Sequence, residues 1–494
     1  MIIAQTKEAR LPDLLAAFAL IAVVLIVSAL ASGIVERGPI SFPIIFLGIG
    51  VILGQRGFGV LSITVHDQTL EVLAILSLSL ILFLDAVRLR FDEGRRAWLV
   101  PILLLGPGTL LVIAIVAGVA SLLLGLGLVS ALLLGAVLAS TDPVVLRDIG
   151  RDERVPVAVR RVLTLEAGMN DIVVLPIVLV LAAVARAEVG GAGDWALFLA
   201  KILIVGPFVG FVIGGVGSWA IQRVDQAMGV RREYQALYGL GLVLASYFGG
   251  TAVGGDGFLA AFAAGIAVVV LNNTLCDCFL EYGETTAEMA MLLTFILFGA
   301  LVSTLFGTIP ILATLALAGV VIFVARPLTI SLVLLPATIS RRARAFVGWF
   351  GPRGLSSLLF ALILVNDGVP GAERLLAIVG LVVFVSVVAH GASATPLAAW
   401  YEREVAKETL AEERESTPGG LFGQKVLNIP RLSIAELAAQ LAGPNPPLVL
   451  DVRSRSSYLH SDGRIPGSIR VLPDQITEWA DEQQRKRAVV TVCT

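Results

Sequence analysis

The stretch LTLEAGMNDIVVLP (residues 163–176) places Glu166, Asn170 and Asp171 in a run that otherwise consists mostly of apolar residues. A charged side chain at the centre of a bilayer costs about 2.5–3.5 kcal/mol on insertion scales. Two carboxylates so close together in an apolar run therefore need a structural or a functional reason.

The composition around this stretch is that of a membrane protein. Of the 494 residues, 57% are hydrophobic and 15% are charged, whereas soluble domains carry about 25% charged residues. Apolar runs recur from Leu14 to Trp400, many of them as long as the roughly 18 residues that a membrane-crossing helix needs. The sequence predicts an all-α polytopic membrane protein.

Charged residues, prolines and glycines divide these runs into about thirteen predicted spans. The spans lie near residues 14–33, 40–54, 70–89, 98–124, 127–146, 157–185, 195–221, 235–250, 255–271, 287–306, 309–338, 343–365 and 374–399. The second of them is short for a helix that crosses a membrane.

Basic residues in the connections between spans predict the orientation of the chain. Arginines gather in odd-numbered connections: Arg88, Arg90, Arg95 and Arg96 in the third, Arg147, Arg151, Arg154, Arg160 and Arg161 in the fifth, Arg223, Arg231 and Arg232 in the seventh, and Arg341, Arg342 and Arg344 in the eleventh. The even-numbered connections carry few basic residues, and the ninth is acidic. Because basic loops stay in the cytoplasm, we expect an integral protein of a prokaryotic-type cell membrane. Its N-terminus would lie outside and its C-terminal region in the cytoplasm.

The composition changes after Trp400, which divides the chain into three predicted parts. Residues 1–400 form the membrane domain, and the charged residues 401–426 form a short helix and a linker that ends in Pro and Gly. Residues 427–494 resemble a small α/β module with strands near Leu448–Val452, near Ser468–Leu472 and in the final AVVTVCT.

Few ionisable residues lie inside the predicted spans and away from their ends. They are Asp85, Asp142, Glu166, Asp171, Arg326 and Arg353. An ionisable residue within a membrane span is by default a hypothesis of a functional site. The competing interpretation is a buried ion pair that holds helices together, and for Glu166 alone it is the better one.

The stretch VLASTDPVVL (137–146) is predicted to interrupt its helix. Pro143 has no backbone N–H, and its ring clashes with the preceding turn. Ser140 and Thr141 offer hydroxyls and freed carbonyl oxygens at the depth of Asp142. In transporters, irregular backbone inside the membrane lines an ion or substrate site; a simple proline kink is the alternative.

A second interruption is predicted in GWFGPRGLSSLLF (348–360). Gly351, Pro352 and Gly354 weaken the helix there, on both sides of Arg353. Two interrupted spans, one in each half of the membrane domain, indicate a transporter built from inverted repeats.

The spacing of the two carboxylates in the opening stretch separates their roles. Asp171 follows Glu166 by five positions, a net turn of about 140° around a helix, so the two are predicted to face different partners. Oxygens of Asp171, Asn170 and Thr141 suit a hard monovalent cation. Burial disfavours the charged form of a carboxylate, so Asp171 can hold either a proton or a cation. That competition, at a site that opens to each side in turn, is sufficient for an antiporter.

Together, these motifs resemble the monovalent cation/proton antiporters of the sodium/proton exchanger type. STDPVV (140–145), EAGMND (166–171), VARPL (324–328) and FGPRG (350–354) occur in the order of that family. The resemblance covers about residues 10–400. It implies a thirteen-helix fold with inverted repeats, two crossing broken helices and a part that forms a homodimer.

The resemblance also implies the parts that individual residues play in ion exchange. Asp171 would bind the cation and the proton, and Asn170 beside it would mark the electroneutral branch of the family. Thr141 and Asp142 would line the site at the first break. Asp85 matches more loosely an acidic residue near the ion path.

Other residues of the motifs would be structural by the same resemblance. Glu166 would pair with Arg326, and Pro143 and Arg353 would support the broken helices. The sequence departs from the family at Ala167, where many members have a serine whose hydroxyl helps to coordinate the ion. This departure leaves the choice between sodium and potassium open.

The C-terminal module resembles a rhodanese-like sulfurtransferase domain in the segment LVLDVRSRSSYLHSDGRIPGSI. Cys493 falls where that family carries its persulfide cysteine. The loop that would follow the cysteine does not occur before Thr494, so we expect the module to be inactive, either as a truncated copy or as a regulatory remnant.

We therefore expect a secondary active transporter, not an enzyme, that exchanges sodium for protons at Asp171; potassium/proton exchange is the alternative. A passive cation channel and a membrane-anchored sulfur or redox sensor are more distant alternatives. The expected partners are sodium or potassium ions, protons, membrane lipid and a second copy of the chain. No cofactor and no nucleic acid is expected.

Overall fold

The computed structural model describes most of the membrane domain and part of the C-terminal module. The described residues are 22–24, 26–30, 41–89, 102–142, 146, 149–150, 152, 154–187, 190–271, 273–337, 339–405, 434–443, 446–453, 458, 465–481 and 488–492. Pro143 and Cys493, which the sequence singled out, lie outside them.

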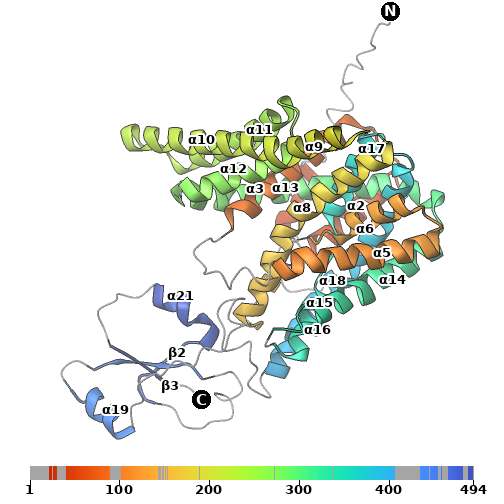
Figure 1. Ribbon diagram of the computed structural model, residues 1–494. Coiled ribbons are helices and arrows are strands. Elements are labelled where there is room, and N and C mark those ends of the chain that lie inside the picture. The colour runs from red at the N-terminus through yellow and green to blue at the C-terminus, as the bar shows by residue number, and fades with distance from the viewer. Residues whose placement is uncertain are drawn as a thin grey trace, which may run out of the picture.

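The membrane domain is a bundle of helices (Figure 1). Their bounds are α2 Phe42–Leu53, α3 Gln68–Val87, α5 Thr109–Leu124, α6 Leu128–Ala139, α8 Val157–Arg186, α9 Ala192–Ala200, α10 Gly206–Met228, α11 Arg232–Ala252, α12 Gly257–Leu271, α13 Asn273–Leu305, α14 Ile311–Val320, α15 Arg326–Val333, α16 Arg341–Trp349, α17 Leu355–Asn366 and α18 Ala372–Val405.

The helices pack in two groups. Helices α10, α11 and α12 pack together and against α3, while α13 packs on α2 and α3. The second group contains α5, α6, α8 and α14 to α18, and the pairs α3–α8 and α13–α18 connect the two groups. Figure 1 shows α10 to α12 on one side of the bundle and α5, α14 and α15 on the other.

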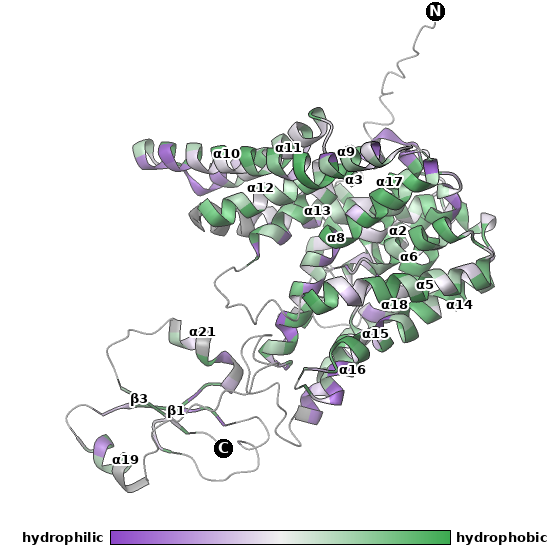
Figure 2. Ribbon diagram, viewed as in Figure 1, coloured by the Kyte–Doolittle hydropathy of each residue, from purple (hydrophilic) through white to green (hydrophobic). Residues whose placement is uncertain are grey.

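The lengths and hydropathy of the helices confirm a polytopic all-α membrane fold. Among the described residues, 7 helical segments are long and apolar enough to cross a bilayer, and four shorter apolar helices of 10–17 residues accompany them. In Figure 2 the helices are mainly hydrophobic, with hydrophilic residues toward ends such as those of α10 and α16. The number of thirteen spans stays a prediction, because most of the first span lies outside the described residues.

One predicted span is much shorter than its helix. The span expected at 287–306 belongs to α13, which begins at Asn273 and includes most of the expected ninth connection. Hydropathy marks the part of a helix that suits lipid, whereas the helix itself continues through polar residues until a break such as Gly or Pro. No proline lies between Asn273 and the end of the span, and the helix continues through Gly283 and Gly299.

Three long helices contain π-helical turns next to prolines. The turns are Leu104–Gly108, Lys201–Val205 and Val321–Ala325. The first contains Pro107, and Pro207 and Pro327 each come two residues after the end of the other two. A proline cannot donate the regular helical hydrogen bond, and a wider turn lets the helix continue past it.

Both predicted breaks are present. Helix α6 ends at Ala139, the residue whose carbonyl would bond to the N–H that Pro143 lacks. Helix α16 ends at Trp349, and α17 begins at Leu355. The two non-helical segments meet, because the backbone N–H of Asp142 donates to the carbonyl oxygen of Pro352 at 2.8 Å.

The C-terminal module contains a parallel three-stranded sheet in the order β2-β1-β3. Its strands are β1 Leu448–Asp451, β2 Ile469–Arg470 and β3 Val489–Val492, and its helices include α19 Ile434–Leu441 and α21 Ile476–Asp481. These strands lie where the sequence placed them. The likeness to a rhodanese domain stays a prediction.

Candidate functional site

Asp171 and Asn170 lie in the middle of α8 and face the end of α6. Their exposed fractions are 0% and 3%. The Ser140 hydroxyl, at the end of α6, donates to Oδ1 of Asp171 at 2.5 Å. The other carboxylate oxygen, Oδ2, has no hydrogen-bond partner among the described residues.

The side chain of Asn170 is fixed by two hydrogen bonds. Its Nδ2 donates to the carbonyl oxygen of Ala139 at 2.9 Å and to Oγ1 of Thr141 at 3.0 Å. A carbonyl can only accept, so this contact determines which end of the amide is the nitrogen. Oδ1 of Asn170 is consequently left buried and without a partner in the described part of the chain.

The site therefore presents two buried oxygen acceptors on consecutive residues, Asn170 and Asp171. A buried acceptor without a donor costs about 1–3 kcal/mol. A bound cation or a proton would satisfy Oδ2 of Asp171. The predicted ligands Asp171, Asn170 and Thr141 thus lie close together. Thr141 bonds to the side chain of Asn170, which is the neighbour of Asp171 in the sequence.

Glu166 points away from this pair, toward α15. Its two carboxylate oxygens accept from Nη1 and Nη2 of Arg326, the second at 2.8 Å, and both side chains are buried. Nη2 of Arg326 also donates to the carbonyl oxygen of Phe350 at 2.8 Å. The ion pair thereby ties α8 and α15 to the end of α16.

A histidine and a serine of α18 hold the second break from its other side. Nε2 of His390 lies 2.9 Å from the carbonyl oxygen of Trp349, the last residue of α16. The backbone N–H of Arg353 donates to Oγ of Ser386 at 2.8 Å, and Nδ1 of His390 lies 3.2 Å from the same hydroxyl. Nδ1 also lies 2.8 Å from the backbone carbonyl oxygen of Ser386, so each ring nitrogen is next to a carbonyl, a group that can only accept a hydrogen bond.

The end of α6 is closed in the same way by side chains from the second half of the chain. Nη1 of Arg353 donates to the carbonyl oxygen of Ser140 at 2.9 Å, and Oγ of Ser357 donates to that of Val137 at 2.9 Å. Arg353 is 1% exposed. It supports the first break as well as the second, in which it lies.

Asp142 serves α17 as a cap. Its Oδ2 accepts from the backbone N–H of Leu355, the first residue of α17, at 2.9 Å. A carboxylate at this position satisfies an unpaired donor and matches the positive end of the helix dipole. The cap uses Oδ2 of Asp142, and the expectation that Asp142 also lines the ion site stays a prediction.

Two glycines permit this close packing. A Cβ atom at Gly354 would overlap the carboxylate of Asp142, and a Cβ atom at Gly351 would overlap the guanidinium of Arg326. Any other residue at either position would displace a charged group from the break.

Asp85 lies in a cavity of about 230 Å³ at one end of α8. Nη1 of Arg88 contacts Oδ1 of Asp85 at 3.3 Å, and Nη2 of Arg88 contacts Oε1 of Glu284 at 2.8 Å. The lining of this cavity continues along α8 as far as Met169, the residue before Asn170.

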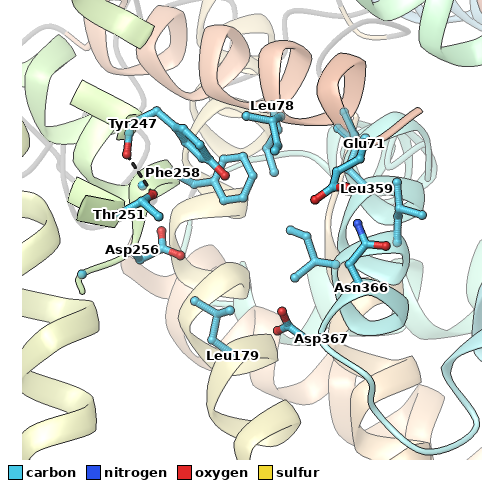
Figure 3. Close-up of a pocket in the computed structure, with 16 residues that line it drawn as sticks. Glu71, Leu78, Leu179, Tyr247, Thr251, Asp256, Phe258, Leu359, Asn366 and Asp367 are labelled. Atoms are coloured by element: carbon cyan, nitrogen blue, oxygen red, sulfur yellow. Dashed lines mark hydrogen bonds between the residues drawn. The ribbon is translucent and has the colours of Figure 1, made fainter. Parts of the chain in front are cut away.

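A second cavity, of about 220 Å³, lies at the opposite ends of α3 and α8. Figure 3 shows the carboxylates of Glu71, Asp256 and Asp367 directed toward it. Its lining reaches Leu179, which lies about two helical turns beyond Asp171 on α8. Asn170 and Asp171 therefore lie on α8 between the residues that line the two cavities.

Several residues of the site escaped the sequence analysis. His390 is one of only three histidines and lies within an apolar span, a signal that was available. From the sequence, Ser140 was expected only to offer a hydroxyl near the break. The sequence does not mark Ser356, Ser357 and Ser386 as site residues, because serine is common in membrane helices.

Known proteins resemble this chain in sequence and in fold. The model of the transmembrane sodium/hydrogen exchanger family matches residues 21–400. A K(+)/H(+) antiporter NhaP of Alkalimonas amylolytica is 29% identical over 394 residues, which cover 79% of this chain and 67% of the relative. The K(+)/H(+) antiporter NhaP2 of Shewanella oneidensis is 27% identical over 449 residues, 88% of this chain and 77% of the relative.

A similar fold occurs in a solved structure, that of the sodium proton antiporter MjNhaP1 from Methanocaldococcus jannaschii at pH 8. It matches with a TM-score of 0.64 and 20% sequence identity, over 79% of this chain and 100% of the other.

The ion pair between Glu166 and Arg326 predicts a strong effect of removing one partner. We expect Glu166→Gln to destabilise the protein by about 3–5 kcal/mol, because it leaves a buried guanidinium without its counter-charge. The double variant Glu166→Leu/Arg326→Leu should recover much of the loss. Thermal unfolding of the detergent-solubilised protein measures both, and a double variant that only adds the two losses would contradict the pairing.

His390 predicts a contrast between two substitutions. His390→Leu leaves the Trp349 carbonyl without a donor and should lower the free energy of unfolding by about 1–3 kcal/mol. His390→Gln retains a hydrogen-bond donor of similar reach, so its free energy of unfolding should fall clearly less. Equal losses in the two variants, measured by the same unfolding assay, would show that the hydrogen bond is not what His390 contributes.

Proposed function

This chain belongs to the transmembrane sodium/hydrogen exchanger family, and from that premise we propose that Asp171 and Asn170 form its transport site. The protein is a secondary cation/proton antiporter of the membrane and not an enzyme. In the proposed mechanism, a monovalent cation and a proton compete for the carboxylate of Asp171.

One observation carries the site assignment. Oδ2 of Asp171 and Oδ1 of Asn170 are both buried, and neither has a hydrogen-bond partner within the described residues. The neighbouring charges are already engaged, since Glu166 pairs with Arg326 and Asp142 caps α17. Asp171 is therefore the carboxylate left to exchange its counter-ion.

The same arrangement supports electroneutral exchange. The residue beside Asp171 is the amide Asn170, whose charge does not change, so the site gains one positive charge with a proton and one with a monovalent cation. One proton for one cation is the exchange that leaves the charge of the site equal in both loaded forms.

The two cavities supply the proposed access routes. The cavity lined by Asp85, which we call the inner cavity, reaches Met169 beside Asn170, and the cavity of Figure 3, which we call the outer cavity, reaches Leu179. The inner cavity contains Arg88, which belongs to one of the arginine-rich connections. By the positive-inside rule we assign this end to the cytoplasm and the N-terminus to the outside.

Sodium is the proposed cation, and potassium is the serious alternative. The family model is named for sodium, whereas the relatives NhaP and NhaP2 are named as K(+)/H(+) antiporters. The site itself supplies uncharged oxygens and one carboxylate, which suit either ion.

The remaining proposals concern the surroundings of the transport unit. Residues 1–400 form the antiporter domain, 401–426 a linker and 427–494 a cytoplasmic module. Large apolar side chains such as Phe208, Trp219 and Leu237 are exposed on α10 and α11. Membrane lipid and a second copy of the chain are the proposed covers for this face.

We predict that Asp171→Asn abolishes exchange, because an amide can neither release a proton nor balance a cation. The measurement is cation-dependent proton movement in proteoliposomes, with sodium, lithium and potassium tested across pH. Asp194→Asn, a change at the start of α9, is the control and should retain exchange. Exchange by Asp171→Asn at a rate near that of the unaltered chain would refute the site assignment.

A further inference from the structure

The hydroxyl groups nearest to the transport carboxylate come from the two broken helices. Ser140 ends α6 and donates to Asp171 at 2.5 Å. Ser356 is the second residue of α17, and its hydroxyl interacts with the same carboxylate. Both serines are fully enclosed, with exposed fractions of 1% and 2%.

Helix α8 itself contributes no hydroxyl at the corresponding place. Ala167 lies four residues before Asp171, one turn away on the same helix face, and its methyl group has no oxygen to offer a cation. The nearby Thr141 already accepts the hydrogen bond of Asn170. The hydroxyls that act on the carboxylate of Asp171 itself are those of Ser140 and Ser356.

A serine hydroxyl can serve a carboxylate and a cation at the same time. It has one hydrogen to donate and two lone pairs. When the hydrogen points to Asp171, a lone pair remains for a cation that also contacts the free oxygens of Asp171 and Asn170.

Resting on the proposed function, we propose that Ser140 and Ser356 are cation ligands that determine the specificity of the antiporter. Their hydroxyl oxygens, one from each broken helix, complete the coordination shell of the cation, to which Ala167 of α8 contributes no oxygen. With the free oxygens of Asp171 and Asn170 they form a set of oxygen ligands around one monovalent cation.

The number of such ligands affects small cations most. A smaller cation gives up its water more reluctantly, and it therefore depends more on the number and strength of the oxygens that replace this water. Removal of one hydroxyl should weaken the binding of sodium and lithium more than that of potassium. The two serines thus bias the site toward the smaller ions.

The test compares Ser140→Ala, Ser356→Ala and Ser357→Ala in proteoliposomes that contain the full chain. Ser357 is the matched control, because it neighbours Ser356 but donates to a carbonyl of α6 instead of the transport carboxylate. We expect the first two variants to raise the apparent KM for sodium by about tenfold, the loss of one hydrogen-bond-sized interaction with a charged group. The apparent KM for potassium should change less. Ser357→Ala should leave the ratio of the sodium KM to the potassium KM unchanged.

A rescue experiment separates a ligand from a merely structural residue. Ala167→Ser places a hydroxyl one turn from Asp171, so in the Ser356→Ala background it should recover part of the sodium affinity. Ser140→Thr and Ser356→Thr keep a hydroxyl and should keep the ratio of sodium to potassium KM, which makes the test possible even where an alanine variant does not fold.

The possible results also distinguish this proposal from the assignment of Asp171. If Asp171→Asn is inactive while the serine variants shift the KM for sodium and potassium equally or not at all, the serines are not specificity-determining ligands and the transport site stands. If threonine variants alter the ratio as strongly as alanine variants, the hydroxyl is not the cause. If Asp171→Asn still exchanges ions, the proposed function itself is wrong.

Discussion

Inside a bilayer no water is available to bond to a free backbone carbonyl, and this constraint governs the centre of the antiporter. Two helices stop in the middle of the membrane domain, and each stop leaves carbonyl groups without helical partners. Those of α6 bond to side chains of α8, α17 and the second break. Those of α16 bond to Arg326 and His390. Each break is thus held by residues from distant parts of the chain.

The same constraint prepares the site for its ion. Because the amide nitrogen of Asn170 is used to close α6, its carbonyl oxygen turns to the other side and is left for a cation. Asp142 caps α17 and Glu166 neutralises Arg326, whereas Oδ2 of Asp171 accepts no hydrogen bond from the described residues. Structural bonding therefore decides which oxygens remain free, and the transport chemistry uses those that remain.

Local features of the sequence predicted much of this arrangement. Pro143 and the Gly-Pro-Arg-Gly segment at 351–354 marked the breaks, and the helical spacing of Glu166 and Asp171 separated their directions. Hydropathy placed the spans but not the start of α13, because it measures contact with lipid and not continuity of the helix. The contacts of Ser140, Ser356 and other serines could not be predicted, since they depend on how segments far apart in the sequence cross in space.

The hydrogen bond between Asp142 and Pro352 joins the two breaks directly, and with Arg353 and Ser357 it links the first half of the chain to the second. Neither half contains a complete ion site. If the two halves descend from one duplicated ancestor, they have not been free to diverge since: a change at one crossing segment is acceptable only when the other still fits it. Because the two segments cross, the two halves of the chain can change only together.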